Sequence, residues 1–283
     1  MENSVSVQTK TFCGHDNIKL VGDAYGDPSD DPVLFLHGGG QTRHAWSGAA
    51  KVLAGKGWYV VVLDQRGHGE SDWAQEKDYS VNSFTADVRK VAKTFNKPPA
   101  LVGASMGGGT ALVAQGESDT QICSALVLVD VTPRIEMEGT KKIMDFMTAK
   151  PEGFETLSEA ADAIAAYTPH RKRSKNIEGV EKNLRQLPNG RYRWHWDPDM
   201  LGVRYTERMR SPDRMLRAAE NIKVPTLLVR GQLSDVVSME GVNEFMGVVP
   251  HAKFVDVKGA SHMVVGDQND MFTDAVLEFL RDL

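Results

Sequence analysis

Residues 100–107 read ALVGASMG, and this stretch decides the fold class. Its first half is a short apolar run of the kind that forms a buried strand, and its second half matches the pattern G-x-S-x-G. A serine in that pattern lies on a sharp, strained turn between a strand and a helix, so the residues two positions away on either side must be small. Glycine occupies both, at Gly103 and Gly107. The stretch therefore predicts an exposed nucleophile, Ser105.

Outward from this turn, short runs rich in valine and leucine alternate with segments of helical spacing. The apolar runs are Val33–Leu36, Tyr59–Leu63, Ala100–Val102, Ala125–Val131, Thr226–Val229 and Phe254–Val257. The helical segments are Ala45–Lys56, Val81–Phe95, Gly107–Gln115 and Met271–Leu280. Continuous apolar character is typical of strands covered on both faces. The alternation predicts an α/β fold with a mostly parallel, doubly wound sheet, preceded by an antiparallel hairpin over residues 5–12 and 18–24.

One long segment interrupts this alternation. From residue 133 to 223 the sequence shows helical patterns, at 141–148, 158–167, 180–186 and 212–221, and no strong buried strand. The strand pattern resumes at Pro225. We therefore expect a core formed by residues 1–132 and 224–283, with residues 133–223 inserted between two of its strands as an all-helical cap.

Glycine-rich turns follow two of the predicted strands. HGGG at residues 37–40 can expose a backbone N–H, and the N–H of Met106 lies at a predicted helix start. Gly39 and Met106 are therefore the candidate donors of an oxyanion hole. The chain resembles the α/β-hydrolase superfamily, in its serine-esterase branch with a helical cap. The resemblance rests on three motifs in this order: HGGG, then DQRGHGES at 64–71, then G-x-S-x-G. In that family the second of these turns is structural, which implies no catalytic task for His68.

The resemblance also orders the rest of the site. In the family, an acid and then a histidine follow the nucleophile at the ends of the last two strands. His262 follows the run 254–257 and is the expected general base, so activity should fall at acid pH, where the imidazole is protonated. Asp235 is the expected acid, although it stands one place later than in the commoner G-x-x-D turn. Asp130, directly after Ala125–Val129, is the alternative acid.

This set of residues predicts a hydrolase that cleaves a small-molecule ester, lactone or thioester through an acyl-serine, with no metal or organic cofactor. Two related activities stay open: hydrolysis of carbon–carbon bonds in ring-cleavage products, and cofactor-free peracid formation. The first is disfavoured because Met263 follows the histidine, where such enzymes commonly have tryptophan. A non-catalytic receptor or scaffold of the same fold is the alternative of another class.

The cap offers candidates for the substrate pocket. RYRWHW at residues 191–196 alternates aromatic and basic side chains, so Trp194 and Trp196 would share one face of an extended segment. We expect Gly40, Trp194, Trp196 and Met263 at the pocket. The alternative is that the aromatic residues only fix the cap onto the core.

Composition narrows the class of partner. The chain has 283 residues, a net charge of −5 and a pI near 5.9, which does not favour nucleic acid or an anionic membrane as a partner. No apolar run approaches the ~20 residues of a membrane span, and the N-terminus lacks the pattern of a signal peptide. We therefore expect a cytoplasmic protein with a small-molecule acyl substrate as its partner. The sequence makes no prediction of oligomeric state.

Overall fold

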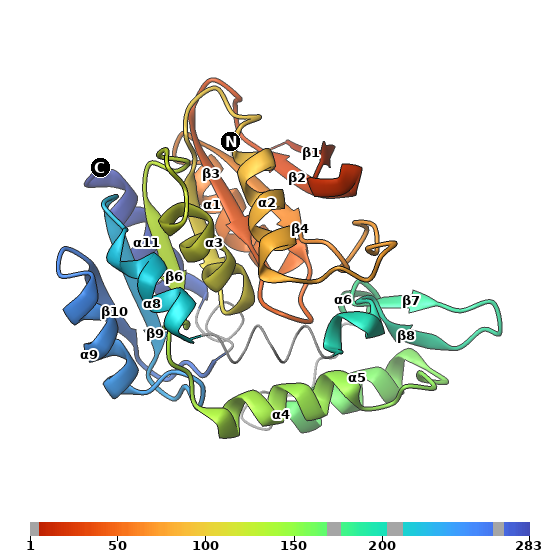
Figure 1. The fold of residues 1–283 in the computed structure, drawn as a ribbon. Coiled ribbons are helices and arrows are strands. Elements are labelled where there is room, and N and C mark those ends of the chain that lie inside the picture. Colours follow the sequence, from red (N-terminus) through yellow and green to blue (C-terminus); the bar gives the residue numbers. More distant parts are fainter. Residues whose placement is uncertain (1–5, 169–176, 203–211, 263–268) are drawn as a thin grey trace.

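The computed structural model describes residues 6–168, 177–202, 212–262 and 269–283, and its centre is an eight-stranded sheet in the order β1-β2-β4-β3-β5-β6-β9-β10 (Figure 1). The strands are β1 (Val7–Cys13), β2 (Lys19–Tyr25), β3 (Asp31–Leu36), β4 (Trp58–Asp64), β5 (Ala100–Ala104), β6 (Leu126–Val129), β9 (Thr226–Gly231) and β10 (Lys253–Val257). β1 and β2 pair antiparallel with each other, and β2 pairs antiparallel with β4; all other pairs are parallel. The predicted mostly parallel sheet with its N-terminal hairpin is confirmed.

Helices cover both faces of the sheet (Figure 1). They are α1 (Ser47–Ala54), α2 (Val81–Ala92), α3 (Met106–Gly116), α8 (Pro212–Glu220), α9 (Met239–Val248) and α11 (Asn269–Arg281). Side chains of α1 and α11 share one apolar cluster with the sheet, and side chains of α2, α3, α8 and α9 share the other. This arrangement confirms the doubly wound architecture.

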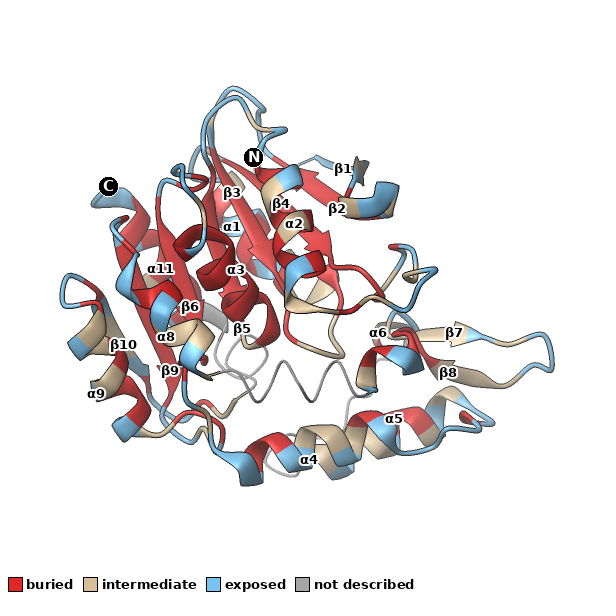
Figure 2. Ribbon diagram, viewed as in Figure 1, coloured by how far each residue is buried: buried red, intermediate tan, exposed pale blue. Residues whose placement is uncertain are grey.

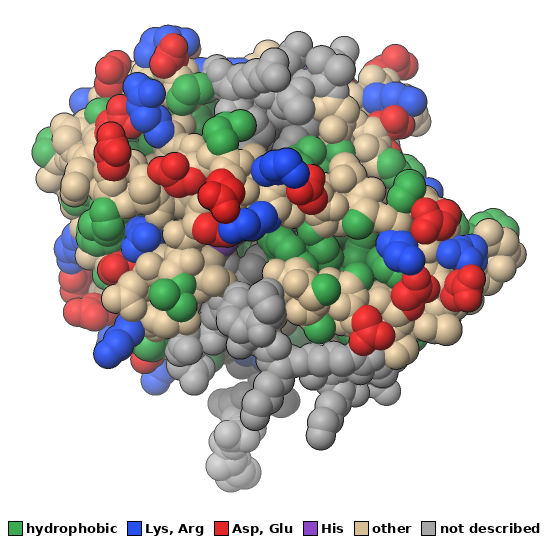
Figure 3. Space-filling view, turned by 90° about the horizontal axis from the view of Figure 1, so that it is seen from below, with side chains coloured by type: hydrophobic (Ala, Val, Ile, Leu, Met, Phe, Trp, Pro, Cys, Tyr) green, Lys and Arg blue, Asp and Glu red, His purple; other side chains and the backbone are tan. Residues whose placement is uncertain are grey.

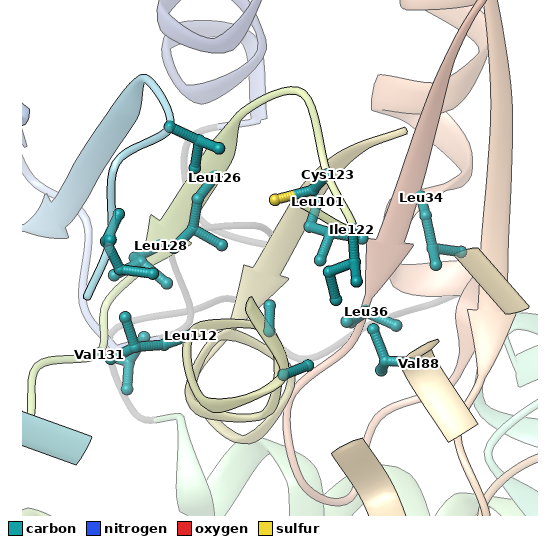
Figure 4. Close-up of a cluster of buried hydrophobic side chains, with 14 of the residues drawn as sticks. Leu34, Leu36, Val88, Leu101, Leu112, Ile122, Cys123, Leu126, Leu128 and Val131 are labelled. Carbon is teal, nitrogen blue, oxygen red and sulfur yellow. The ribbon is translucent and has the colours of Figure 1, made fainter. Parts of the chain in front are cut away.

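The continuous apolar runs have a simple explanation in the strands themselves. Side chains alternate across a strand, so Leu34 and Leu36 of β3 enter one cluster while Val33 and Phe35 enter the other. Figure 2 shows the central strands and α3 as buried, and Figure 4 shows Leu36 beside Val88 of α2 within the first cluster. Because both faces of such a strand are buried, both sets of alternating side chains are apolar, and the sequence shows a continuous apolar run.

The insertion between β6 and β9 is not all helical. It contains α4 (Met137–Thr148), α5 (Leu157–Tyr167), α6 (Ile177–Glu181), β7 (Leu184–Gln186), β8 (Tyr192–Trp194) and a 3-10 turn, η3 (Pro198–Leu201). β7 and β8 form an antiparallel hairpin, so the helix predicted over residues 180–186 is wrong beyond Glu181. Asn189-Gly190 lies at its tip with Gly190 at a φ of 82°, and such a dipeptide is a hairpin signal.

The last predicted helix of the insertion lies with the core. α8 packs on α3 and α9, so it belongs to the helical layer over the sheet although it precedes residue 224. α4 and α5 lie across the end of the sheet at which the parallel strands finish (Figure 1). Within the described parts of the chain, no helix has the length and apolar character needed to cross a membrane.

Candidate active site

Ser105 occupies a strained turn between β5 and α3. Its backbone has a φ of 45° and a ψ of −110°, a region that residues with a side chain rarely adopt. The flanking glycines permit the turn: a Cβ on Gly103 would lie 2.5 Å from the Gly107 carbonyl carbon, and one on Gly107 would lie 2.4 Å from the Leu36 carbonyl oxygen. The backbone thus has the elbow geometry that the G-x-S-x-G pattern predicts.

His262 lies in a loop after β10, and its ring contacts a carboxylate. His262 Nδ1 is 2.6 Å from Asp130 Oδ2, and both side chains are largely buried. Asp130 follows β6 and also accepts hydrogen bonds from the Gly231 N–H and the Ser234 hydroxyl. These contacts hold the carboxylate in one orientation and leave His262 Nε2 as the nitrogen that can face a nucleophile.

The expectation that Asp235 lies against His262 is wrong. The Asp235 side chain is 48% exposed, and its Oδ2 pairs with Lys142 of α4 at 3.1 Å. Ser234 takes the place that the acid has in a G-x-x-D turn, and its hydroxyl donates to Asp130. The one-residue offset seen in the sequence therefore turns Asp235 toward the cap, and Asp130, the alternative, is the carboxylate beside the imidazole.

The sheet order brings these side chains to one edge. Ser105, Asp130, Ser234 and His262 follow β5, β6, β9 and β10, which are successive neighbours in the sheet. Carboxyl ends of parallel strands meet at the same edge, where ligands of open α/β sheets bind. Ser105, Asp130 and His262 all line one cavity of about 550 Å³. The structure therefore gathers a hydroxyl, an imidazole and a carboxylate at a single opening.

The glycine loop after β3 borders the same cavity. Gly38 N–H donates to Gln41 Oε1, and Gly40 N–H donates to His68 Nε2. Within the described residues, Gly39 N–H makes no hydrogen bond, whereas Gly38 N–H and Gly40 N–H both donate within the protein. Gly39 N–H can therefore donate to a ligand.

The turn after β4 makes bracing contacts. Arg66 forms a buried ion pair with Asp87 of α2, at 2.6 and 2.8 Å. Asp64 accepts the backbone N–H of Arg43 at 2.7 Å and that of Glu70 at 3.0 Å. These contacts fit the structural role that the resemblance implies for this turn.

The cavity wall is mainly apolar. Its apolar lining residues include Val81, Met106, Val131, Ile143, Phe146, Met147, Trp194, Trp196 and Met215. Gly40, Trp194 and Trp196 line the cavity as expected, whereas Met263 lies outside the described residues. The two indoles stack at 5.0 Å, and Trp194 also packs against Phe154. Seen from the cap side, apolar side chains gather near the middle of this face, with charged ones around them (Figure 3).

Two histidines beside the glycine loop are held neutral. Burial lowers the pKa of His37, and burial together with the nearby His37 ring lowers the pKa of His195 to about 3. No group of three or more His, Cys, Asp or Glu side chains within the described residues is arranged to hold a metal ion. His195, in the cap, was not singled out by sequence reasoning.

The shifted pKa of His195 predicts a pH-dependent stability. An exposed imidazole has a pKa of 6.5, so between pH 6.5 and about 3 the unfolded chain binds a proton that the folded chain does not. The free energy of unfolding should therefore fall on acidification through this window, by up to roughly 1.4 kcal/mol per pH unit from this group. Urea unfolding at several pH values checks this: wild type should lose stability more steeply than His195→Gln. Parallel profiles would contradict it.

Comparison with known proteins places the chain in a family. Residues 31–268 match the sequence profile of the alpha/beta hydrolase fold, and the chain belongs to this family. It is 30% identical to esterase Rv0045c of Mycobacterium tuberculosis, over 88% of this chain and 81% of the relative. It is 29% identical to the mouse sn-1-specific diacylglycerol lipase ABHD11, over 90% and 82%. A solved E-2-(acetamidomethylene)succinate hydrolase, 22% identical, superposes with a TM-score of 0.86 over 98% of this chain and 100% of that one. The predicted α/β-hydrolase fold is confirmed.

Proposed function

We propose that this chain is a serine esterase that cleaves a small-molecule carboxylic ester through an acyl-enzyme on Ser105. The observation that carries the proposal is the shared cavity: the strained Ser105, the His262–Asp130 pair and the glycine loop all border it. The two relatives aligned over most of the chain are named an esterase and a lipase, which supports an ester as the bond cleaved.

In the proposed mechanism His262 Nε2 takes the proton of the Ser105 hydroxyl as its oxygen attacks the ester carbonyl. The backbone N–H groups of Gly39 and Met106 stabilise the oxyanion, and losing one such donor typically costs roughly 3–4 kcal/mol in the barrier. The imidazolium, held by Asp130, gives its proton to the leaving alcohol. His262 then takes a proton from a water molecule that attacks the acyl-serine, and returns that proton to the Ser105 oxygen as the carboxylic acid leaves.

The cavity indicates which esters to test. Its volume is within the range of small-molecule sites, and its aromatic and aliphatic wall favours an apolar group of moderate size. A larger lipid would have to leave part of its chain outside. We therefore propose short- to medium-chain or aromatic esters as the substrate class.

A panel of p-nitrophenyl esters of graded acyl length, with a lactone, an anilide and a ring-cleavage dienone, tests this proposal. We expect hydrolysis of the esters, with an optimum at an intermediate chain length, and labelling of Ser105 by a fluorophosphonate probe. Turnover of the dienone alone would favour the carbon–carbon hydrolase, and perhydrolysis with acetate and peroxide would favour peracid formation. A chain that binds esters without probe labelling or turnover would be a receptor.

A further inference from the structure

Three buried histidines lie between the glycine loop after β3 and the turn after β4. His37 and His68 are fully buried, and His195 is 2% exposed. The ring centroids of His37 and His68 are 4.8 Å apart, and those of His68 and His195 are 5.8 Å apart. The first two belong to the core, whereas His195 follows β8 of the cap. The proposed mechanism gives none of them a proton to transfer.

Each ring contacts a different peptide group of the glycine loop. His37 Nδ1 is 2.8 Å from the Gly38 carbonyl oxygen. His68 Nε2 accepts the Gly40 N–H at 3.3 Å, and His195 Nε2 is 3.3 Å from the Gly40 carbonyl oxygen. The three consecutive peptide groups that join residues 38 to 41 therefore each have a histidine partner.

The second nitrogen of each ring contacts the backbone of the turn after β4. The contacts are Gln65 N–H to His37 Nε2 (3.0 Å), Gly69 N–H to His195 Nδ1 (2.7 Å) and His68 Nδ1 to the Arg66 carbonyl oxygen (3.0 Å). A backbone N–H can only donate and a carbonyl can only accept, so these contacts fix the tautomers. His37 and His68 carry their proton on Nδ1, and His195 carries it on Nε2, from which it donates to the Gly40 carbonyl.

These bonds matter because the loop consists of three glycines. Glycine has more backbone freedom than any other residue, so the loop needs outside contacts to keep one conformation. The Gly38 carbonyl and the Gly39 N–H belong to one trans peptide group and point in opposite directions. The bond from His37 to that carbonyl therefore aims Gly39 N–H away from the histidines.

We propose that His195 is a positioning residue of the oxyanion hole, which makes the cap part of the catalytic geometry. Its bond to the Gly40 carbonyl holds the peptide group after the one whose N–H His68 accepts. The docked cap hairpin therefore acts together with His37 and His68 to keep the direction of Gly39 N–H. This inference rests on the proposed esterase function. It assigns the cap a role in the rate of the reaction as well as in substrate choice.

The chain segment around His195 supports this coupling. Trp194 and Trp196 line the cavity, whereas the alternate residues His195 and Asp197 contact the core turns. Asp197 N–H donates to the Gly67 carbonyl oxygen at 2.9 Å, and the Tyr79 hydroxyl donates to Asp197 Oδ2 at 2.5 Å. One four-residue segment thus forms part of the substrate cavity and holds the glycine loop.

Two substitutions, each of which replaces one of the two ring nitrogens of His195, distinguish a positioning role from general structural support. In His195→Gln the amide nitrogen can occupy the place of Nε2 and donate to the Gly40 carbonyl. In His195→Asn the amide reaches only the place of Nδ1 and can serve Gly69 alone, and His195→Phe serves neither. We expect kcat for the best p-nitrophenyl ester to fall about 10- to 100-fold in the Asn and Phe variants, with KM unchanged. His195→Gln should stay within about threefold of wild type.

Two further measurements make the result specific. The affinity for a trifluoromethyl ketone, whose adduct carries an oxyanion, should fall in the same proportion as kcat. Asp235→Asn is the matched control, since it removes the Lys142–Asp235 ion pair, a cap-to-core contact that touches neither the glycine loop nor the segment around His195. It should keep kcat within about twofold of wild type. Equal losses of kcat in all three His195 variants, or no loss in any of them, would overturn the proposal.

The tautomer of His195 gives a readout that needs no activity. Long-range ¹H–¹⁵N spectra of the wild-type chain at pH 7 should show a neutral ring protonated on Nε2. A charged ring, or a proton on Nδ1, in an active enzyme would overturn the positioning role alone. If the His195 ring has the expected tautomer but the probe does not label Ser105 and no ester is hydrolysed, the esterase function is overturned, and the positioning role with it.

Discussion

Replacing Ser105 by alanine is expected to lower kcat for p-nitrophenyl esters by roughly a million-fold, the size of loss found when a serine hydrolase loses its nucleophile. The hydroxyl is the atom that forms the covalent bond, and no other side chain occupies the elbow between β5 and α3. The oxyanion donors would remain and could still bind substrate, so the substrate Kd should change little. Steady-state assays and equilibrium binding of a slow substrate measure the two quantities.

The control for this experiment is the fold of the variant itself. Alanine and serine both have a Cβ and meet the same strain at a φ of 45°, so the melting temperature should change little. A fluorophosphonate probe should label wild type once per chain and leave Ser105→Ala unlabelled. Turnover above about one per cent of wild type would place the nucleophile elsewhere, because the oxyanion hole alone supplies far less.

Much of this fold was predictable because its signals are local. Each buried parallel strand is a continuous apolar run, and the G-x-S-x-G turn needs small residues at Gly103 and Gly107 for a close backbone approach that no other residue permits. Chain order then gave His262, because a loop after the last strand reaches the same sheet edge as Ser105. The strand and turn predictions thus depend on sequence distances of a few residues, and the assignment of His262 depends on the order of the strands.

The predictions that failed depend on contacts between distant segments. A one-residue offset decides whether Ser234 or Asp235 turns toward Asp130 and the site, and only the packing of the turn after β9 resolves it. The short hairpin of the cap was signalled by Asn189-Gly190, but its strands of three residues are too short for a periodic pattern. His195 reaches Gly40 across 155 positions, so no local pattern reveals it.

Replacing Asp130 by asparagine should lower kcat by about 10⁴-fold, the loss seen when the acid of a Ser-His-Asp triad becomes an amide. An amide can present its NH₂ group to His262 Nδ1 and so place the ring proton on Nε2, where it prevents proton transfer from Ser105. Substrate affinity should persist, because the carboxylate is 1% exposed and lies behind the imidazole. The measurement is kcat and KM for the best ester, together with the ring tautomer by NMR.

Asp235→Asn is the matched comparison, and the pair decides between the two acids. Asp235 pairs with Lys142 on the surface, and exposed ion pairs contribute little to stability, so this variant should keep kcat within about twofold and lose little stability. Ser234→Ala should fall between the two, since it removes one of the hydrogen bonds that orient Asp130. The opposite result would be an inactive Asp235→Asn variant and an active Asp130→Asn variant. In that case the His262–Asp130 contact would not be the one that supports proton transfer, and the turn after β9 would have to rearrange during catalysis.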